Sequence, residues 1–229
     1  VGSEMCIRDR IYKAAKLMME TYPISGGVKI HLEKHIPIAA GMAGGSTDAA
    51  ATLKGMNRLF DLGCTLKDLM ELGVKIGADV PYCVMGGTAL AEGIGEKLTP
   101  LAPAPDCYVL VAKPDINVST KYVYEHLDAQ EIVKHPDIDG MVEAIAEESL
   151  QGILDRMENV LETVTVSAYP IIQTIKDRMK ELGAINSLMS GSGPTVFGIF
   201  VEKDMARRAY DKLEEEQLAK QIFLTEFCE

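Results

Sequence analysis

The stretch Pro37-Ile38-Ala39-Ala40-Gly41-Met42-Ala43-Gly44-Gly45-Ser46-Thr47 decides how the first half of this chain is organised. It is a loop of small residues that ends in two hydroxyl side chains. Residues 48–53 follow as a typical helix start, and residues 28–33 precede it with the alternation of a half-buried strand. A strand, a glycine loop and a helix N-terminus together form an arrangement that binds phosphate chains.

The glycines of this stretch allow a sharp turn and a close approach of the backbone to an anion. The N–H groups of the first helical turn then point at that anion, and the helix dipole favours its charge. Ser46 and Thr47 can cap the helix or bind phosphate or a metal ion. The alternative is a plain turn, but three glycines followed by two hydroxyls favour phosphate binding. The loop is neither a Walker A loop, which ends in Gly-Lys-Ser/Thr, nor a Rossmann fingerprint.

Composition is ordinary for a soluble globular protein of one large domain or two small ones: 229 residues, 47% hydrophobic and 25% charged. No apolar run approaches the roughly 18 residues of a membrane span. The net charge of −11 argues against a nucleic-acid partner. It leaves a nucleotide open, because a local nest of N–H groups binds phosphate on an acidic protein.

The five cysteines are scattered and form no C-x-x-C pair, which predicts reduced thiols in a cytosol rather than disulfides or a zinc site. Cys83 lies near the expected site, where most cysteines are small buried hydrophobes. The four histidines show no metal-ligand spacing. We expect His31 and His35 to be solvated beside the first strand.

Residues 1–10 contain no hydrophobic core, so they are not a signal peptide. They do not continue the helical pattern that begins near Ile11, and they resemble a translated sequencing adapter. We expect this leader to replace a native N-terminus; the alternative is a genuine short polar tail.

Helices and strands are mixed along the chain, which predicts an α+β fold in two lobes. The prolines between residues 100 and 105 mark the boundary. Thr65 and Asp68 form a capping pattern for a helix that buries Leu66, Leu69, Met70 and Val74. The predicted helices are 11–22, 48–60, from 65, 119/120–127, most of 139–163, 170–182 and 204–216; the predicted strands are 28–33, 88–93, 107–112, 195–201 and 222–227.

Asp79 is the candidate catalytic carboxylate, in an irregular segment at residues 77–81. Phosphoryl transfer needs a residue that orients or deprotonates the attacking hydroxyl, and an Asp near the phosphate loop suits that role. The alternative is a helix-capping Asp after Ile76. We expect Glu92 and Glu96 to be structural or solvated, and Glu214, Glu215 and Glu216 to lie on a solvated helix face.

A second glycine loop, at residues 190–193, is a common turn by itself, but three segments in this order resemble the GHMP kinase superfamily. Residues 37–47 match its motif P-x-x-x-G-x-x-G-G-S-[ST], and residues 190–193 resemble its third motif. Residues 77–83, 86–89 and 93–98 resemble one family within it, the kinases of a cytidine-diphosphate-linked methylerythritol. The resemblance runs from about Ile11 to the last strand.

The resemblance implies an ATP-dependent, Mg²⁺-assisted kinase that phosphorylates the 2-hydroxyl of the methylerythritol moiety. Asp79 would be the base, and Ser46 would contact the metal. Tyr82 and Lys121 are candidate cytidine contacts. The ATP phosphates would be held by Pro37, Ile38, Ala39, Ala40, Gly41, Met42, Ala43, Gly44, Gly45, Ser46, Thr47, Gly191, Ser192 and Gly193.

The implied fold is a two-lobed GHMP kinase fold, with a left-handed βαβ nucleotide lobe at residues 11–104, incomplete, and a ferredoxin-like lobe at residues 105–229. The implied protein is bacterial and cytoplasmic. It takes a small-molecule substrate, uses no nucleic acid or membrane, and is a monomer or homodimer.

The sequence departs from the family at its start. The family opens with a strand whose Lys pairs with the catalytic Asp, followed by a Gly-Tyr-His that helps hold cytidine, and neither occurs here. Lys13, Lys16, Lys29 and Lys34 do not match that Lys, so we expect roughly sixty residues to be missing, within the variation of domain size. The loss removes a charge-stabilising group and leaves a sheet edge unpaired, which invites association. Two alternatives therefore stay open: another GHMP small-molecule kinase, or a catalytically dead nucleotide-binding module.

Overall fold

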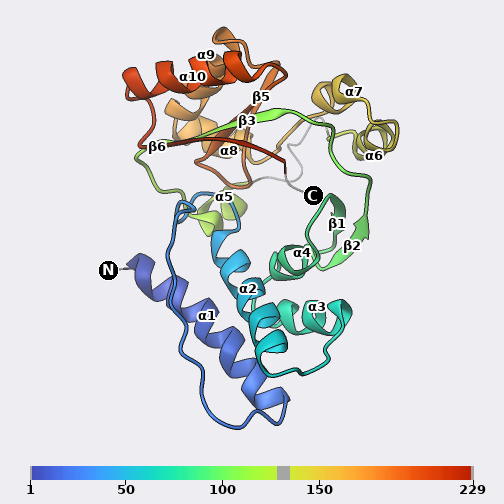
Figure 1. Cartoon of the computed structure of the whole chain (residues 1–229). Helices are drawn as coiled ribbons and strands as arrows, with labels where there is room; N and C mark the ends of the chain where they lie inside the picture. The colour runs from blue at the N-terminus through green and yellow to red at the C-terminus, as the bar shows by residue number, and fades with distance from the viewer. Residues whose placement is uncertain (1, 128–134, 228–229) are drawn as a thin grey trace. The chain divides into compact units, whose positions relative to one another are not determined.

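The computed structural model describes residues 2–127 and 135–227, with side chains from residue 10 onward (Figure 1). The chain forms two units. The first comprises Val1–Ile38 and Ala43–Leu101, and the second comprises Ala39–Met42 and Ala102–Glu229. The glycine loop is therefore shared, because its middle four residues belong to the second unit and its ends to the first.

Four helices and one hairpin build the first unit: α1 (Gly2–Thr21), α2 (Gly44–Leu59), α3 (Leu66–Val74), α4 (Val80–Met85), β1 (Ala89–Glu92) and β2 (Lys97–Pro100). Helix α1 lies along α2, which also packs against α3 and α4 (Figure 1). Small residues allow this close packing: Ala14, Ala49 and Ala50 are buried around Met18 and Leu53. The apolar run after the glycine loop thus buries one face of α2 against α1.

Helix α3 begins as the sequence predicts. The Thr65 side chain accepts the Asp68 N–H, and the Asp68 carboxylate accepts the Thr65 N–H, so the capping box is confirmed. Its predicted apolar face is partly wrong. Leu66 and Val74 are exposed, whereas Leu69 and Leu72 are buried. The helix is only nine residues long, so its two ends extend beyond the surface that covers its middle.

Two predictions for the first unit are wrong. Residues 28–33 form no strand. Alternation alone does not make a strand, because its N–H and C=O groups need a partner, and no described segment pairs with these residues. Helix α1 also continues back through the leader to Gly2. Once a helix has started, each added residue forms one more backbone hydrogen bond, so the helix can extend without burying further side chains.

The hairpin of the first unit was predicted only in its first half. Strand β1 is confirmed, but β2, which pairs with it in register from Ala89 opposite Pro100 to Glu92 opposite Lys97, was not foreseen. Gly93 and Gly95 have φ values of 70° and 108° in the connecting turn. Their left-handed backbone is the signal that marks this turn as a hairpin connection.

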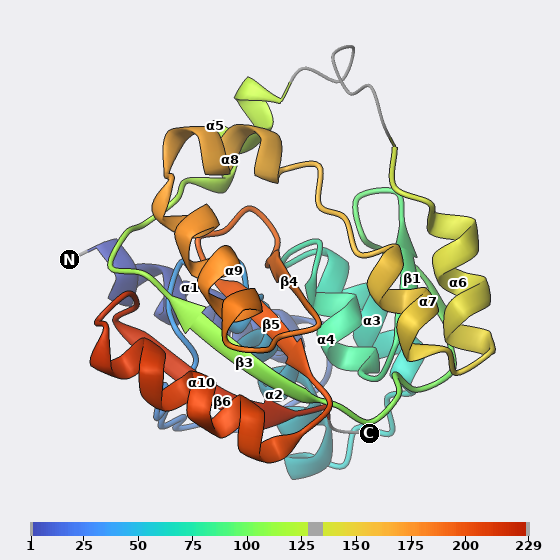
Figure 2. The same cartoon turned by 90° about the horizontal axis from the view of Figure 1, so that it is seen from above.

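A four-stranded antiparallel sheet forms the second unit, in the order β4-β5-β3-β6. Its strands are β3 (Tyr108–Lys113), β4 (Asn186–Met189), β5 (Val196–Phe200) and β6 (Gln221–Glu226). The long connection from β3 to β4 ends in helix α9 (Ile171–Glu181), and α10 (Lys203–Glu215) connects β5 to β6. Both helices cover the same face of the sheet (Figure 2). This β-α-β-β-α-β order is the ferredoxin-like arrangement, so the expectation for the C-terminal lobe is confirmed.

The core of the second unit lies between the sheet and those two helices. Leu110 and Phe200 face Ile172, Met179 and Leu213, and all five side chains are fully buried. Helices α9 and α10 were predicted within one residue at each end. Their apolar residues recur every three to four positions, which is the strongest pattern that a sequence offers.

The segment 139–163 was predicted as mostly helical, and the structure divides it. It contains α6 (Ile138–Ala146), α7 (Leu150–Asp155) and the start of α8 (Glu162–Ala168). Ser149 breaks the run, because its hydroxyl accepts the Gly152 N–H and starts a new helix. Helix α5 (Thr120–His126) begins at its Ser119 cap, as predicted, whereas strand β4 was not foreseen.

Cys64, Cys83 and Cys107 are free, and the side chains of Cys6 and Cys228 lie outside the described residues. Within the described part of the chain, no helix has the length and apolar character that crossing a bilayer requires.

Candidate active site

The first turn of α2 begins earlier than predicted. Ala43 is the N-cap, with a left-handed φ of 48°, and the helix starts at Gly44 rather than Asp48. The Thr47 N–H donates to the Ala43 carbonyl at 2.9 Å. The N–H groups of Gly44, Gly45 and Ser46 precede that first helical bond, so they have no acceptor within the helix. Three backbone donors and the positive end of the dipole thus converge where an anion can bind.

Neither predicted hydroxyl caps α2, because no side chain accepts from its first N–H groups. Ser46 is 1% exposed, and its Oγ accepts a hydrogen bond from the Arg10 guanidinium. Thr47 is exposed and donates back to the Ala43 carbonyl at 3.2 Å. Sequence reasoning missed Arg10 because it lies in the leader. Its position four residues before the buried Ala14, on the same helix face, is the signal that would have found it.

Lys34, which precedes the glycine loop, binds the first turn of α2 through its ammonium group. Its Nζ donates to the Gly44 carbonyl at 2.8 Å and to both Asp48 carboxylate oxygens at 2.8 and 2.7 Å. The two side chains are 15% and 9% exposed, so this ion pair is partly desolvated. Removing either partner alone would leave a charge with little solvent, which is strongly destabilising. The pair therefore helps to hold the first turn of α2 in place.

Asp79 lies directly before α4, at its N-cap position. Its side chain makes no capping hydrogen bond, so the interpretation as a helix-capping Asp is wrong for the carboxylate. Only the backbone serves the helix, through the Cys83 N–H donating to the Asp79 carbonyl at 3.1 Å. The Asp79 carboxylate is exposed and makes no side-chain hydrogen bond to another described residue.

Cys83 connects Asp79 with the start of α2. Its Sγ lies 3.6 Å from the Thr47 Oγ1. Burial raises the pKa of the Cys83 thiol, and the negative charge of Asp79 adds to that increase, whereas the Thr47 hydrogen bond and Arg10 oppose it. The first unit therefore brings the first turn of α2, Arg10 and Asp79 into one neighbourhood.

The middle of the glycine loop packs against the second glycine loop within the second unit. Ser190 Oγ donates to the Gly41 carbonyl at 2.9 Å. Gly41 has φ 68°, and a Cβ built on it would lie 2.1 Å from the Ser190 carbonyl oxygen. Only glycine fits there, so the predicted need for Gly41 has a concrete cause in backbone contact.

The turn at residues 190–193 is closed by its own backbone. The Gly193 N–H donates to the Ser190 carbonyl at 2.9 Å, and Gly191 and Gly193 have φ values of 55° and 84°. Among the described hydrogen bonds, none is donated by the N–H of Gly191 or Ser192. Thr195, two residues after the turn, buries a hydroxyl without a described partner. The turn thus presents unused donors, as a phosphate-binding element requires.

The other predicted residues have simpler surroundings. The Tyr82 hydroxyl donates to the Gly87 carbonyl at 2.9 Å, and Lys121 is exposed and paired with Glu125. Glu96 is structural, because its carboxylate accepts the Ile94 N–H at 2.8 Å. The acidic face of α10 is exposed as predicted, although Glu216 also binds Arg178 of α9. Pro37 and Ala40 are buried, and Ile38 and Ala39 are exposed.

No cluster of three or more His, Cys, Asp or Glu side chains that could hold a metal ion occurs in the described part of the chain. Ser46, the predicted metal contact, faces the Arg10 guanidinium. A cation at hydrogen-bond distance opposes a divalent ion at the same oxygen. As placed here, Ser46 therefore fits an anion beside Arg10 better than it fits Mg²⁺.

Comparison with known proteins identifies the family. Residues 9–87 match the GHMP kinases N terminal domain, and residues 141–220 match the GHMP kinases C terminal family. The chain is 56% identical to the 4-diphosphocytidyl-2-C-methyl-D-erythritol kinase of Lachnoclostridium phytofermentans, over 96% of this chain and 75% of that protein. It is 51% identical to the kinase of the same name from Caldicellulosiruptor saccharolyticus, over 97% of this chain and 76% of that protein.

Solved structures extend the comparison. A 4-(cytidine 5'-diphospho)-2C-methyl-D-erythritol kinase superposes with a TM-score of 0.81 at 34% identity, covering 95% of this chain and 77% of that chain. A homoserine kinase from Cytophaga hutchinsonii gives 0.79 at 21% identity, covering 97% and 76%, and shows the fold alone. The chain therefore belongs to the GHMP kinases, and within them to the family of 4-diphosphocytidyl-2-C-methyl-D-erythritol kinases.

Proposed function

We infer that this chain catalyses ATP-dependent phosphorylation of the 2-hydroxyl of 4-diphosphocytidyl-2-C-methyl-D-erythritol, a step of isoprenoid precursor synthesis. The observation that carries this function is the pairing of family membership at 56% identity with a free Asp79 carboxylate beside the first turn of α2. The alternative of another GHMP small-molecule kinase is not favoured, because the homoserine kinase likeness is only 21% identical.

The reaction divides between backbone donors and one carboxylate. The N–H groups of Gly44, Gly45 and Ser46 hold phosphate oxygens, and Arg10 adds positive charge next to them. Asp79 accepts the proton of the attacking hydroxyl as the new oxygen–phosphorus bond forms. The bond from the γ-phosphorus to its bridging oxygen breaks, and ADP leaves with the electron pair. Gly191, Ser192 and Gly193 contribute further donors to the nucleotide.

Mg²⁺ belongs to this proposal through ATP rather than through a protein cage. Mg²⁺ is commonly bound by phosphate oxygens with one or two protein ligands and several waters. Ser46 would serve as such a ligand only after the Arg10 guanidinium leaves its hydroxyl. What Mg²⁺ supplies is neutralisation of charge on the phosphates.

We further propose that the protein acts in the cytoplasm on a small molecule, without nucleic acid or membrane, as a monomer or homodimer. Residues 11–104 serve ATP binding and residues 105–229 complete the kinase. Lys121 and Tyr82 contact cytidine, the latter with its ring because its hydroxyl is already bonded.

Coupled ADP release with the cytidine-linked substrate tests this function. The assay compares this chain, a chimera in which the N-terminal residues of the Lachnoclostridium phytofermentans kinase precede residues 11–229, and Asp79→Asn in each. The control is Asp61→Asn, an exposed residue with φ 47°, which Asn tolerates.

We expect turnover, and we expect Asp79→Asn to lower it by about 10³-fold or more while nucleotide binding is retained. The reason is that this substitution removes a general base together with its charge. Nucleotide binding without turnover in both the chain and the chimera would mean a catalytically dead module. Turnover of homoserine or mevalonate instead would overturn the substrate.

A further inference from the structure

We propose that Asn159 and Glu162 are positioning residues that set the shape of the turn at residues 190–193, and through Ser190 the place of Gly41. Neither residue was singled out by sequence reasoning. Asn159 lies just before α8 and Glu162 is the first residue of that helix, both within the second unit. The role for nucleotide rests on the proposed function, whereas the role for the turn does not.

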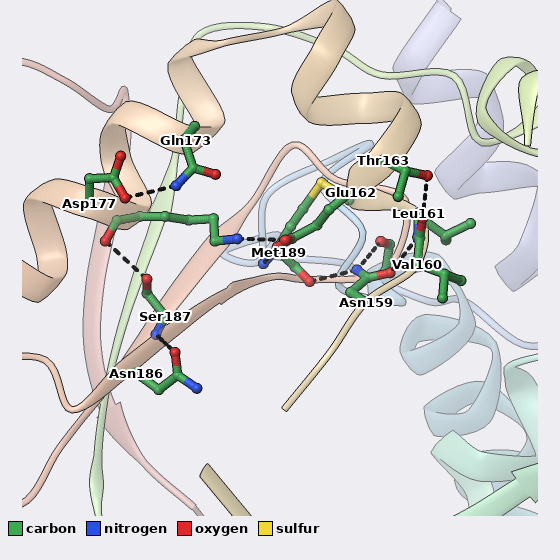
Figure 3. Close-up of polar contacts among 12 residues, drawn as sticks. Asn159, Val160, Leu161, Glu162, Thr163, Gln173, Asp177, Asn186, Ser187 and Met189 are labelled. Atoms are coloured by element: carbon green, nitrogen blue, oxygen red, sulfur yellow. Dashed lines mark hydrogen bonds and ion pairs between the residues drawn. The ribbon is translucent and has the colours of Figure 1, made fainter. Parts of the chain in front are cut away.

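Asn159 holds the turn by its amide (Figure 3). Its Nδ2 donates to the Met189 carbonyl and to the Gly191 carbonyl, both at 2.8 Å. Its Oδ1 accepts the Leu161 N–H at 3.0 Å. One NH₂ group thus donates to two carbonyl oxygens, one at the end of β4 and one within the turn. A side chain without that donor leaves two carbonyl dipoles facing each other.

Glu162 holds the last residue of β4 from the same side (Figure 3). Its Oε1 accepts the Met189 N–H at 2.7 Å, and its Oε2 accepts from the Lys176 ammonium of α9. The two side chains are 17% and 10% exposed. Charge-assisted hydrogen bonds in such a partly desolvated place are stronger than neutral ones, so the carboxylate is a firm anchor.

Ser192 is fixed by two further hydroxyls. The Thr120 and Ser192 hydroxyls lie 2.9 Å apart, and Thr165 of α8 donates to the Ser192 carbonyl at 3.3 Å. Ser192 is 6% exposed. Asn159 and Thr165 therefore bind the carbonyls of Gly191 and Ser192, and Glu162 binds the N–H of Met189 directly before the turn, so the segment 159–165 restrains the turn at three points.

This arrangement has a consequence for Gly41. Ser190 holds the Gly41 carbonyl by its hydroxyl and lies against its Cα. If Asn159 releases the turn, Ser190 moves and Gly41 loses its support. Donors that are already oriented stabilise developing charge without reorganisation, so a loosened turn weakens nucleotide binding.

Asn159→Asp is the sharpest test, because it replaces the donating NH₂ with an accepting oxygen of almost the same size. It retains the acceptor for the Leu161 N–H. Asn159→Ala removes both functions without adding repulsion. The matched control is Asp177→Asn on α9, whose exposed side chain bonds only with Gln173 among the described contacts (Figure 3).

Amide hydrogen exchange on the full chain, without ligand, reads the turn directly. The Ser190 N–H donates to Thr195 and the Gly193 N–H to Ser190, so both are expected to be protected. We expect Asn159→Asp to speed their exchange by about tenfold or more, Asn159→Ala to act less, and Asp177→Asn to leave it unchanged. Exchange in β3 should be unchanged in all three variants.

Binding of ADP and of a non-hydrolysable ATP analogue, measured by calorimetry on the same variants, tests the second step. We expect Asn159→Asp to weaken binding by about tenfold, while Asp177→Asn binds like the parent. In whichever protein of the activity assay shows turnover, we expect the variants to change KM for ATP in the same order. We expect KM for the second substrate to stay unchanged.

The outcomes separate the two proposals. Equal exchange in Asn159→Asp and the parent would overturn the positioning role, whatever the nucleotide does. Faster exchange with unchanged nucleotide affinity would confine Asn159 to the shape of the turn and overturn its role in binding. If the parent binds no nucleotide, the proposed function fails, while the exchange result still decides the role of Asn159 in the turn. Glu162→Gln, which retains an acceptor for Met189, should speed exchange less than Asn159→Asp.

Discussion

Asp79 and Cys83 lie one helical turn apart at the start of α4, and the charge of Asp79 affects the pKa of the Cys83 thiol. The sequence suggested Asp79 as a base on the grounds of an irregular segment near a phosphate loop. The structure adds that its carboxylate caps nothing and that its negative charge contributes, after burial, to the raised pKa of the half-buried Cys83 thiol. The two side chains therefore lie close enough for the Asp79 carboxylate to influence the Cys83 thiol.

Alkylation of Cys83 measures this effect. Because the negative Asp79 raises the pKa of the Cys83 thiol, Asp79→Asn should lower it and increase the thiolate fraction at any pH below the pKa. At pH values between about 8 and 9, we expect iodoacetamide to label Cys83 faster in Asp79→Asn than in the parent, as followed by peptide mass spectrometry. Cys107, whose pKa burial also raises, is the internal control and should not change. An unaltered pH profile for Cys83 would place Asp79 too far away to act.

Helix ends in this protein are fixed in two different ways. Helix α3 carries its own signal, a Thr65 and an Asp68 that bond reciprocally, and it was predicted from four residues. Helix α2 has no side-chain cap and begins at a left-handed Ala43. Its start depends on Lys34, which lies ten residues away and binds the Gly44 carbonyl. The second kind of end is not visible in a local pattern.

Thr65→Ala tests the local signal. Loss of a capping side chain costs about 1 kcal/mol of stability, so we expect the free energy of unfolding to fall by that amount. Denaturant unfolding followed by circular dichroism measures it. Thr174→Ala is the control, because among the described contacts its exposed hydroxyl bonds only to the carbonyl of Pro170, the N-cap of α9. Equal losses in both variants would mean that the capping box contributes nothing of its own.

The whole molecule contains two units with separate cores. The first core surrounds Leu53 in α2, and the main core of the second surrounds Phe200 in β5. No residue in the described part of the chain belongs to both. Cores that share no side chains can open independently, so each unit is expected to behave as a cooperative unit in hydrogen exchange.

Leu53→Ala tests that independence. Leu53 is fully buried, and Leu-to-Ala substitutions in cores destabilise by about 2–5 kcal/mol. We expect exchange protection to fall in α1 and α2 and to persist in β3 and β5. The reciprocal change, Val196→Ala in the second core, should do the opposite. Loss of protection throughout the chain in either variant would show one cooperative unit.

The sequence by itself determined much of this protein, because much of its information is local. Helices α9 and α10 follow from apolar periodicity, and Gly41 and the hydroxyls of residues 46–47 follow from a motif that also indicates the family. Strand β4, by contrast, is short and lies between a helix and a turn, so its identity depends on pairing with β5. Residues 28–33 show the converse, since their alternation has no described partner to make it a strand.

The tertiary structure decided what depends on distant partners. The roles of Asn159 and Glu162 arise from contacts with residues 27 to 32 positions away, and Arg10 reaches Ser46 across 36 positions. A glycine loop is recognisable because its function needs particular residue types at fixed spacing. The side chains that hold it are not, because a hydrogen bond constrains where an amide or carboxylate lies in space and leaves its place in the chain free.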